Sequence, residues 1–182
     1  DTERLAEHIN RILNLAKIET KTYGGDFVTA DLVQTVQQFY QHNSHLFRNC
    51  DIRIHDPGGQ AFLYPINQPL FEMLVMNLLN NAIKYNDSEQ PGIDIRFLRM
   101  KNKLHIRFED NGIGIEKEDI KKIFRKFYQA GAGRPESLLP KGCGLGLYLV
   151  QNIARMHKGK VIAANRPEGG GVFTLILPAP RV

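Results

Sequence analysis

One segment of helical length constrains this sequence most, because it is apolar around most of its circumference and polar along a single line. The segment runs from Gln68 to Tyr85. At ~100° per residue, three of its polar side chains, Asn77, Asn81 and Lys84, fall within ~60° of one another. Burying amides and an ammonium without partners is unfavourable, so this line must border a polar site. Carboxamide oxygens suit a hard cation and a lysine suits phosphate, and the line therefore predicts a site for both.

The rest of the apolar pattern predicts further helices and a sheet. Helical spacing predicts helices over residues 1–19, 30–45, 119–127 and 145–157. Alternation of apolar and polar residues predicts strands over residues 52–55, 61–64, 93–97, 104–108, 160–164 and 172–177. The last four strands fall into two hairpins, closed at Lys101–Lys103 and Pro167–Gly171. This order predicts an α+β fold, a two-layer sandwich in which a mixed, mostly antiparallel sheet packs on helices, preceded by an isolated helix.

The first helix carries an apolar stripe that it cannot bury by itself. The stripe consists of residues at helical spacing, Leu5, Ile9, Ile12 and Ala16, widened by Leu13 and Leu15. The run Tyr23-Gly24-Gly25-Asp26 ends the helix. An isolated helix of this length needs a partner, and no later segment has the pattern of a bundle partner. We expect the partner helix outside these 182 residues or on another chain.

Length and composition fit one domain with a small appendage. The chain has 182 residues, and 42% of them are hydrophobic, enough to build one core. No apolar run approaches the ~20 residues that span a bilayer, and no signal peptide opens the chain. Since the first residue is Asp rather than Met, we expect a fragment of a parent that could be anchored in the inner membrane. Cys50 and Cys143 lie far apart without metal-ligand spacing, which favours a reduced, cytoplasmic domain.

The net charge of +5 raises the question of nucleic-acid binding. Residues 116–141 hold seven basic and four acidic side chains, so this segment alone supplies +3. A local excess beside a glycine-rich loop fits a small ligand that bears phosphate. A nucleic-acid surface would need interleaved aromatic residues or a known motif, which this pattern lacks. We therefore expect no nucleic-acid partner.

Two glycine-rich motifs lie at the ends of predicted elements. Asp110-Asn-Gly-Ile-Gly114 follows the strand 104–108, where glycine lets the backbone approach a flat ligand, although an ordinary turn has the same composition. Gly142-Cys-Gly-Leu-Gly-Leu147 opens the helix 145–157 and offers unpaired N–H groups to phosphate. This second motif follows no strand, so it is not the dinucleotide-binding fingerprint, and the chain contains no P-loop lysine motif.

In this order, the polar helix line and the two glycine motifs resemble the N box and the two glycine boxes of the GHKL ATPase superfamily, over residues 67–178. That superfamily includes DNA gyrase B subunits, ninety-kilodalton heat-shock chaperones, mismatch-repair ATPases of the MutL type and histidine kinases. The resemblance implies a Bergerat-type ATP-binding fold, with ATP and Mg²⁺ as its ligands.

Finer features resemble the sensor histidine kinase branch. Asn81-Ala-Ile-Lys-Tyr85 resembles its N box, Ile123–Tyr128 its F box and Gly171–Pro178 its closing strand. The opening helix followed by Asp31-Leu32-Val33 resembles the last helix of the dimerisation domain and its connector. One departure is Lys126, where the F box usually has an arginine, whose planar fork suits phosphate better.

The resemblance also implies a division of the chain and roles for single residues. Residues 1–22 would end a dimerisation domain, and residues 23–182 would form the catalytic ATP-binding domain. Asp110 would accept the hydrogen bond of the adenine amino group, with Thr174 supporting it through water. Asn81 would coordinate Mg²⁺, with Asn77 and Lys84 as catalytic residues that also contact the nucleotide. The other expected nucleotide contacts are Tyr85, Gly112, Gly114, Ile115, Phe124, Gly142, Gly144, Leu145, Gly146 and Leu147. Residues 116–141 would form a lid.

The amide of Asn77 bears on the type of reaction. Related ATPases place a glutamate there as general base, and an amide cannot accept a proton at neutral pH. We infer phosphoryl transfer to a side-chain nucleophile rather than efficient hydrolysis, and the resemblance implies that this nucleophile is a histidine. No histidine of this chain lies in the family's acceptor context, and we expect all six to be surface or partly packed residues: His8, His42, His45, His55, His105 and His157.

The expected partners follow from the same resemblance. They are the phosphoacceptor histidine domain of the same protein, in cis or in trans, and a cognate response regulator, with a homodimeric parent. Three alternatives stay open: a clamp-type ATPase, a serine kinase of the anti-sigma-factor type, and a pseudokinase that only binds nucleotide. Steady-state ATP hydrolysis would favour the first, and serine phosphorylation of a partner the second.

Overall fold

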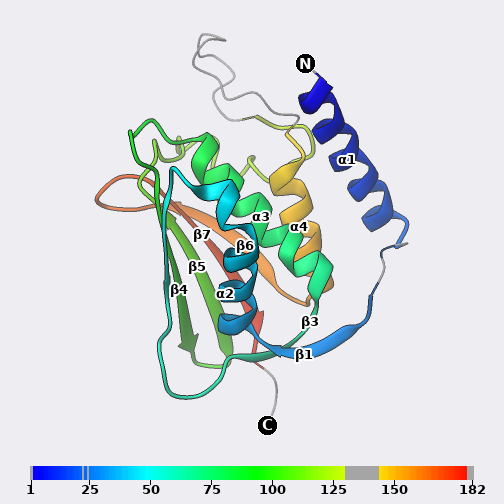
Figure 1. Ribbon diagram of the computed structural model, residues 1–182, viewed down its shortest axis with the longest axis vertical. Coiled ribbons are helices and arrows are strands. Elements are labelled where there is room, and N and C mark those ends of the chain that lie inside the picture. Colours follow the sequence, from blue (N-terminus) through cyan, green and yellow to red (C-terminus); the bar gives the residue numbers. More distant parts are fainter. Residues whose placement is uncertain (1, 22, 24, 130–143, 180–182) are drawn as a thin grey trace.

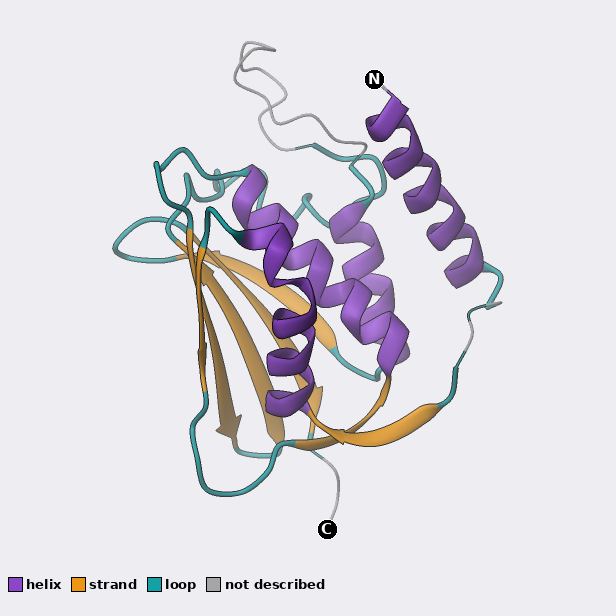
Figure 2. Cartoon of the chain, viewed as in Figure 1, coloured by secondary structure: helices purple, strands orange, loops and turns teal. Residues whose placement is uncertain are grey.

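The computed structural model describes residues 2–21, 23, 25–129 and 144–179, drawn in colour in Figure 1. The elements follow in the order α1 (Thr2–Glu19), β1 (Phe27–Asp31), α2 (Leu32–Asn43), a 3₁₀ helix (Ser44–Phe47), β2 (Asp51–His55), β3 (Leu63–Asn67), α3 (Gln68–Lys84), β4 (Gly92–Met100), β5 (Lys103–Asp110), α4 (Gly146–Met156), β6 (Lys160–Asn165) and β7 (Gly171–Pro178). Figure 2 separates the helices from the strands by colour.

A five-stranded sheet in the order β2-β4-β5-β7-β6 forms one layer. β2 runs parallel to β4, and the other neighbouring strands are antiparallel. The helices α2, α3 and α4 cover one face of this sheet (Figures 1 and 2). The predicted α+β architecture, a mixed and mostly antiparallel sheet packed on helices, is confirmed.

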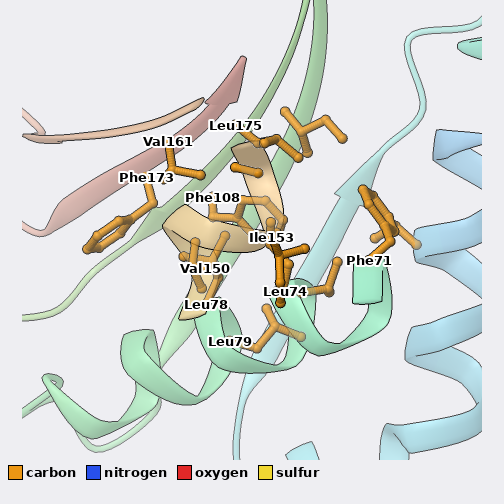
Figure 3. Close-up of a cluster of buried hydrophobic side chains, with 14 of the residues drawn as sticks. Phe71, Leu74, Leu78, Leu79, Phe108, Val150, Ile153, Val161, Phe173 and Leu175 are labelled. Atoms are coloured by element: carbon orange, nitrogen blue, oxygen red, sulfur yellow. The ribbon is translucent and has the colours of Figure 1, made fainter. Parts of the chain in front are cut away.

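The core lies between the sheet and the helices. Phe108 of β5 lies opposite Phe173 of β7, and both rings point to the helical layer. Leu78 of α3 and Ile153 of α4 belong to the same cluster, and all four side chains are buried (Figure 3). Each buried side chain of this size contributes ~1.5–3 kcal/mol, so the apolar alternation of the strands fixes which sheet face the helices cover.

The N-terminal half differs from the prediction in its strand pairing. The strand expected at 61–64 runs from Leu63 to Asn67 and pairs with β1, which the sequence pattern did not predict. β2 instead joins the edge of the main sheet. The side chain of Asp31 accepts hydrogen bonds from the N–H groups of Val33 and Gln34, at 3.0 and 3.3 Å. Asp31 thereby caps α2 and ends β1, so the helix begins at Leu32 and not at residue 30.

A second difference concerns residues 119–127, where a short helix was expected. They form consecutive turns instead. The backbone carbonyl of Asp119 accepts from both Lys122 N and Ile123 N, at 2.7 and 3.0 Å. Hydrogen bonds that span three residues and four residues are therefore mixed here. A regular helical ladder does not develop from this mixture.

His157 joins the β1–β3 ribbon to α3 and α4, and the expectation that it is a surface or partly packed histidine is wrong. It is 3% exposed. Its Nε2 accepts from Asn67 N at 3.1 Å, and its Nδ1 lies 2.8 Å from the carbonyl of Ile153. Tyr64 Oη donates to the carbonyl of His157 at 2.6 Å. Nε2 can accept only in the neutral ring, which therefore carries its proton on Nδ1.

α1 lies beside α4 (Figure 1), and only part of its predicted apolar stripe is covered. Leu15, which widens the stripe, and Ile18 are buried, whereas Leu5, Ile9 and Ile12 are 61%, 47% and 53% exposed. The described part of the chain thus leaves the rest of the stripe uncovered. Among these same residues, no helix combines the length and the apolar character needed to cross a membrane.

Candidate functional site

Asp110, the last residue of β5, is the most buried carboxylate of the candidate site. It is 6% exposed. Its Oδ1 accepts from the N–H groups of Gly112 and Gly171, at 2.9 and 3.0 Å. Its Oδ2 accepts no hydrogen bond from any described residue. Burial raises the pKa of Asp110, while these N–H groups and the charge of Arg166 act to lower it. One carboxylate oxygen is therefore fixed, and the other is available to a donor.

The turn between β6 and β7 packs directly against Asp110, and the sequence analysis did not assign it to the site. Gly170 has φ +90°, and a Cβ there would lie 1.9 Å from the carbonyl oxygen of Asp110. Arg166 Nη1 donates to the same oxygen at 3.0 Å. The run of three glycines at positions 169–171 is the sequence signal that could have indicated such a close approach.

Thr174, which was expected to support Asp110, is not brought to it. Thr174 pairs with Arg107 in the β5–β7 register, so the two side chains share the sheet face away from the helices. Phe173, its neighbour, faces the helices. The contact with Asp110 is made three residues earlier, where a Cβ on Gly171 would lie 3.2 Å from Oδ2.

The first glycine loop presses on the end of α3. A Cβ on Gly112 would lie 2.3 Å from the carbonyl oxygen of Tyr85, and Ile113 N donates to that oxygen at 3.1 Å. Glycine is therefore required at position 112 by a backbone contact. The loop that follows Asp110 thus contacts Tyr85, at the C-terminal end of α3.

The polar line of α3 faces the start of α4. Asn77 Nδ2 donates to the carbonyl of Met73 at 2.8 Å, and a Cβ on Gly146 would lie 3.1 Å from Asn77 Oδ1. Asn81, one turn later, is partly buried, and its side chain makes no hydrogen bond to a described residue. The first glycine motif therefore contacts the end of α3 at Tyr85, and the second contacts α3 at Asn77.

The first turn of α4 has no side-chain cap and no acidic residue. The N–H groups of such a turn attract anions. Gly144 has φ +69°, and a Cβ there would lie 2.6 Å from the carbonyl carbon of Phe127. Leu145 is fully buried and Leu147 is packed on the core, so both support the turn from beneath. Gly142 lies outside the described residues.

The segment that resembles an F box contributes a core residue and an ion pair. Phe124 packs edge-on against Phe173, with ring centroids 6.3 Å apart, and Ile115 also packs on the core. Lys126 Nζ lies 3.1 Å from Glu19 Oε1 of α1. The lysine that replaces the usual arginine is therefore engaged by α1.

Tyr85 and Tyr128 both lie near Asp119. Tyr128 Oη donates to Asp119 Oδ1, and this hydrogen bond raises the pKa of Tyr128. Burial raises the pKa of Tyr85, and the negative charge of Asp119 raises it further. Asp119, which the motif analysis did not single out, thus bonds Tyr128 and acts on Tyr85 through its charge.

The donor set fits a magnesium–phosphate ligand on chemical grounds. The described residues contain no cluster of three or more His, Cys, Asp or Glu side chains that could hold a metal ion. The amide oxygen of Asn81 is a hard ligand without a protein partner in this part of the chain. A hard cation here would complete its coordination with phosphate oxygens and water, as Mg²⁺ commonly does.

Comparison with known protein families and sequences adds independent information. A family model described as histidine kinase-, DNA gyrase B- and HSP90-like ATPase matches residues 66–181. The signal transduction histidine-protein kinase AfsQ2 of Streptomyces coelicolor is 39% identical over 107 residues, which are 59% of this chain and 19% of that protein. The chain therefore matches about a fifth of the length of this relative.

Two solved structures have a similar fold. The nucleotide-free catalytic domain of histidine kinase ThkA gives a TM-score of 0.70 at 24% identity, covering 85% of this chain and 99% of that chain. Full-length ShkA in complex with AMPPNP gives a TM-score of 0.76 at 18% identity, covering 98% of this chain and 36% of that chain. At these identities the likeness establishes the fold.

Proposed function

Because the chain belongs to the family of histidine kinase-, DNA gyrase B- and HSP90-like ATPases, and is the ATP-binding catalytic domain of the sensor histidine kinase class, we propose that it donates the γ-phosphate of Mg·ATP to a histidine on a dimerisation domain. The observation that carries this proposal is the asymmetry of Asp110. Its Oδ1 is held by two backbone N–H groups, while its Oδ2 accepts no hydrogen bond from the described residues.

Asp110 reads the base. An ionised carboxylate is acceptor-only, so the open Oδ2 selects a ligand edge that donates, such as the amino group of adenine. Low exposure strengthens this selection, because a ligand without the donor would leave a buried carboxylate oxygen unpaired. Gly112 and Gly171 hold the carboxylate in place by donating to Oδ1, and these two hydrogen bonds favour its ionised form.

The phosphate side is formed by α3 and the start of α4. The uncapped first turn of α4 directs N–H groups outward, and Gly146 leaves Asn77 Oδ1 beside it. Asn81 and Lys84 extend the same line of α3, where the amide would hold Mg²⁺ and the ammonium would bind a phosphate oxygen. Bound Mg²⁺ would neutralise charge on the β- and γ-phosphates.

Asn77 favours transfer over hydrolysis. The described residues near the start of α4 place an amide, not a carboxylate, against Gly146. An amide cannot take a proton from water, so the site lacks a general base at this position. In-line transfer to a histidine needs positioning and charge neutralisation, which this set of residues supplies.

The wider assembly belongs to the same proposal. Residues 1–22 would end the dimerisation domain, and residues 23–182 would form the catalytic domain. The exposed stripe Leu5, Ile9 and Ile12 supports this division, since a helix of a dimerisation bundle must present an apolar face. The partners would be the phosphoacceptor domain, in cis or in trans, and a response regulator, within a homodimeric parent that could be anchored in the inner membrane.

The test is binding of Mg·ATP to the 182-residue chain by calorimetry, with Asp110→Asn as the variant. The amide places a donor or a weaker acceptor at the Oδ2 position, so affinity should fall at least tenfold. Asp56→Asn is a matched control, because Asp56 also accepts from the N–H of the glycine two residues later, in an exposed turn. Unchanged affinity in Asp110→Asn would remove Asp110 from the site.

A second measurement tests whether this chain donates the phosphate without accepting it. Incubation of the chain with γ-labelled ATP should leave it unlabelled, because the acceptor histidine belongs to the proposed partner domain. An acid-labile phosphohistidine on this chain would contradict that part of the proposal. Rapid steady-state release of phosphate would contradict the preference for transfer.

A further inference from the structure

Asn165, the last residue of β6, makes two hydrogen bonds to a single residue of the first glycine loop. Its Oδ1 accepts from Ile115 N at 2.7 Å, and its Nδ2 donates to Ile115 O at 2.7 Å. A carboxamide carries one acceptor and a pair of donor hydrogens, so one side chain satisfies both backbone groups of Ile115. It binds the loop as a neighbouring strand would.

The shape of the loop depends on this contact. Gly114 has φ +76°, and a Cβ there would lie 2.9 Å from Asn165 Oδ1. Only glycine combines this backbone conformation with so close an approach. On the opposite side, the carbonyl of Tyr85 accepts from Ile113 N. The loop is therefore fixed from two sides, by α3 and by Asn165.

We propose that Asn165 is a positioning residue of the nucleotide site, which holds residues 112–115 in the conformation that receives the adenine base. This inference rests on the proposed function, because it takes the first glycine loop as the adenine side. Asn165 acts through Ile115. When the loop shifts, Gly112 shifts with it, and its N–H is one of the two donors that orient the Asp110 carboxylate.

The expected effect is selective for the base. A loop freed from Asn165 must be ordered again each time a base binds, so every adenine ligand loses affinity by the same factor. The phosphates bind elsewhere, at α3 and α4, and do not change this factor. Asn165 is itself exposed, so its two bonds are modest, and the loss should be about three- to tenfold.

The experiment compares ATP, ADP and adenosine binding to the wild-type chain, Asn165→Asp and Asn165→Ala. Asn165→Asp keeps the shape and the acceptor but turns an oxygen toward the carbonyl of Ile115. Asn43→Asp is the matched control, because Asn43 Nδ2 also donates to a backbone carbonyl, that of Phe39, at the end of α2. Affinities are measured by calorimetry at a temperature where circular dichroism shows each variant fully folded.

Support for the proposal is an equal loss for all three ligands in both Asn165 variants, with the control unchanged. Amide hydrogen exchange at Ile115 should also become faster in Asn165→Ala before any ligand is added. A lower melting temperature with unchanged affinities would overturn it, since Asn165 would then only stabilise the fold. A loss for ATP alone would overturn it too. Failure of the wild-type chain to bind any adenine ligand would contradict the proposed function instead.

Discussion

The ammonium of Lys126 lies 3.1 Å from Oε1 of Glu19, so the last turn of α1 is held by the segment that follows the first glycine loop. The same oxygen lies 3.4 Å from Tyr148 Oη, on the helix that begins at the second glycine motif. The carboxylate of Glu19 therefore links α1 both to the segment that contains Lys126 and to α4. Its contribution is small, because the side chains of Lys126 and Glu19 are 39% and 44% exposed.

Glu19→Gln should loosen the end of α1 without affecting the sheet. The amide keeps an acceptor for Tyr148 but loses the ion pair with Lys126. A pair this exposed contributes about 0–1 kcal/mol, so amide exchange in the last turn of α1 should accelerate about two- to fivefold. Hydrogen-exchange mass spectrometry measures this, with peptides from β5 as the internal reference.

Glu7→Gln is the matched control for this prediction. Glu7 forms an ion pair with Arg11 within α1 itself, at 2.6 Å. Removing this ion pair weakens α1 itself but leaves every contact between α1 and the rest of the domain in place. If both variants accelerated exchange in the last turn equally, the Lys126–Glu19 pair would have no specific role in holding α1.

His157 should make stability depend on pH below neutrality. Burial lowers the pKa of His157 below its ordinary value of 6.5. The unfolded chain therefore takes up this proton at a higher pH than the folded chain. Stability is complete well above pH 6.5 and falls as the pH drops through that value toward the lowered pKa. The limiting slope for one group is about 1.4 kcal/mol per pH unit, measured by urea unfolding at pH 7.5, 6.5 and 5.5.

His157→Gln separates this histidine from the other titrating groups. The variant should be less stable at pH 7.5, because the buried contacts to Asn67 and Ile153 are lost or altered. Its stability should then change less between pH 7.5 and 5.5 than that of the wild-type chain. His45→Gln, an exposed control, should keep the wild-type slope. A wild-type slope in His157→Gln would assign the pH dependence to other groups.

The sequence pattern predicts the main sheet and α3 because their buried residues recur at regular spacing. In β5, the buried Leu104, Ile106 and Phe108 alternate with the less buried His105 and Arg107, so this strand can be read from the sequence alone. β7 is buried along nearly its whole length, and its run of apolar residues indicates it. β1 has no such signal: it is five residues long, and its Phe27 and Val28 are 42% and 64% exposed. Its pairing with β3 is a tertiary outcome, and each of the two strands leads directly into a helix, capped by Asp31 and Asn67 respectively.

Within the candidate site, the residues of the motifs could be predicted from the sequence, but the residues that hold those motifs in place could not. Asp110, Asn77 and the glycines stand in recognisable local patterns. Asn165 contacts Ile115 across fifty residues, and nothing in its own neighbourhood distinguishes it from an ordinary strand end. Thr174 was misplaced for a related reason, since a shift of an odd number of residues along a strand moves a side chain to the opposite face.

Gly170→Ala tests whether the β6–β7 turn is part of the site, with Gly169→Ala as its matched control. The two glycines have similar backbones, φ +90° and +100°, so alanine at either position carries a similar conformational strain of about 1–2 kcal/mol. Only Gly170 is crowded: its Cβ would lie 1.9 Å from the carbonyl oxygen of Asp110, whereas no atom lies within 4 Å of a Cβ on Gly169. The clash should add about 1–3 kcal/mol to the loss of unfolding free energy measured in urea.

Because relief of the clash must move Asp110 itself, ATP affinity should fall in Gly170→Ala and persist in Gly169→Ala. Equal losses of stability and affinity in both variants would mean that backbone strain alone, and not contact with Asp110, requires glycine at position 170.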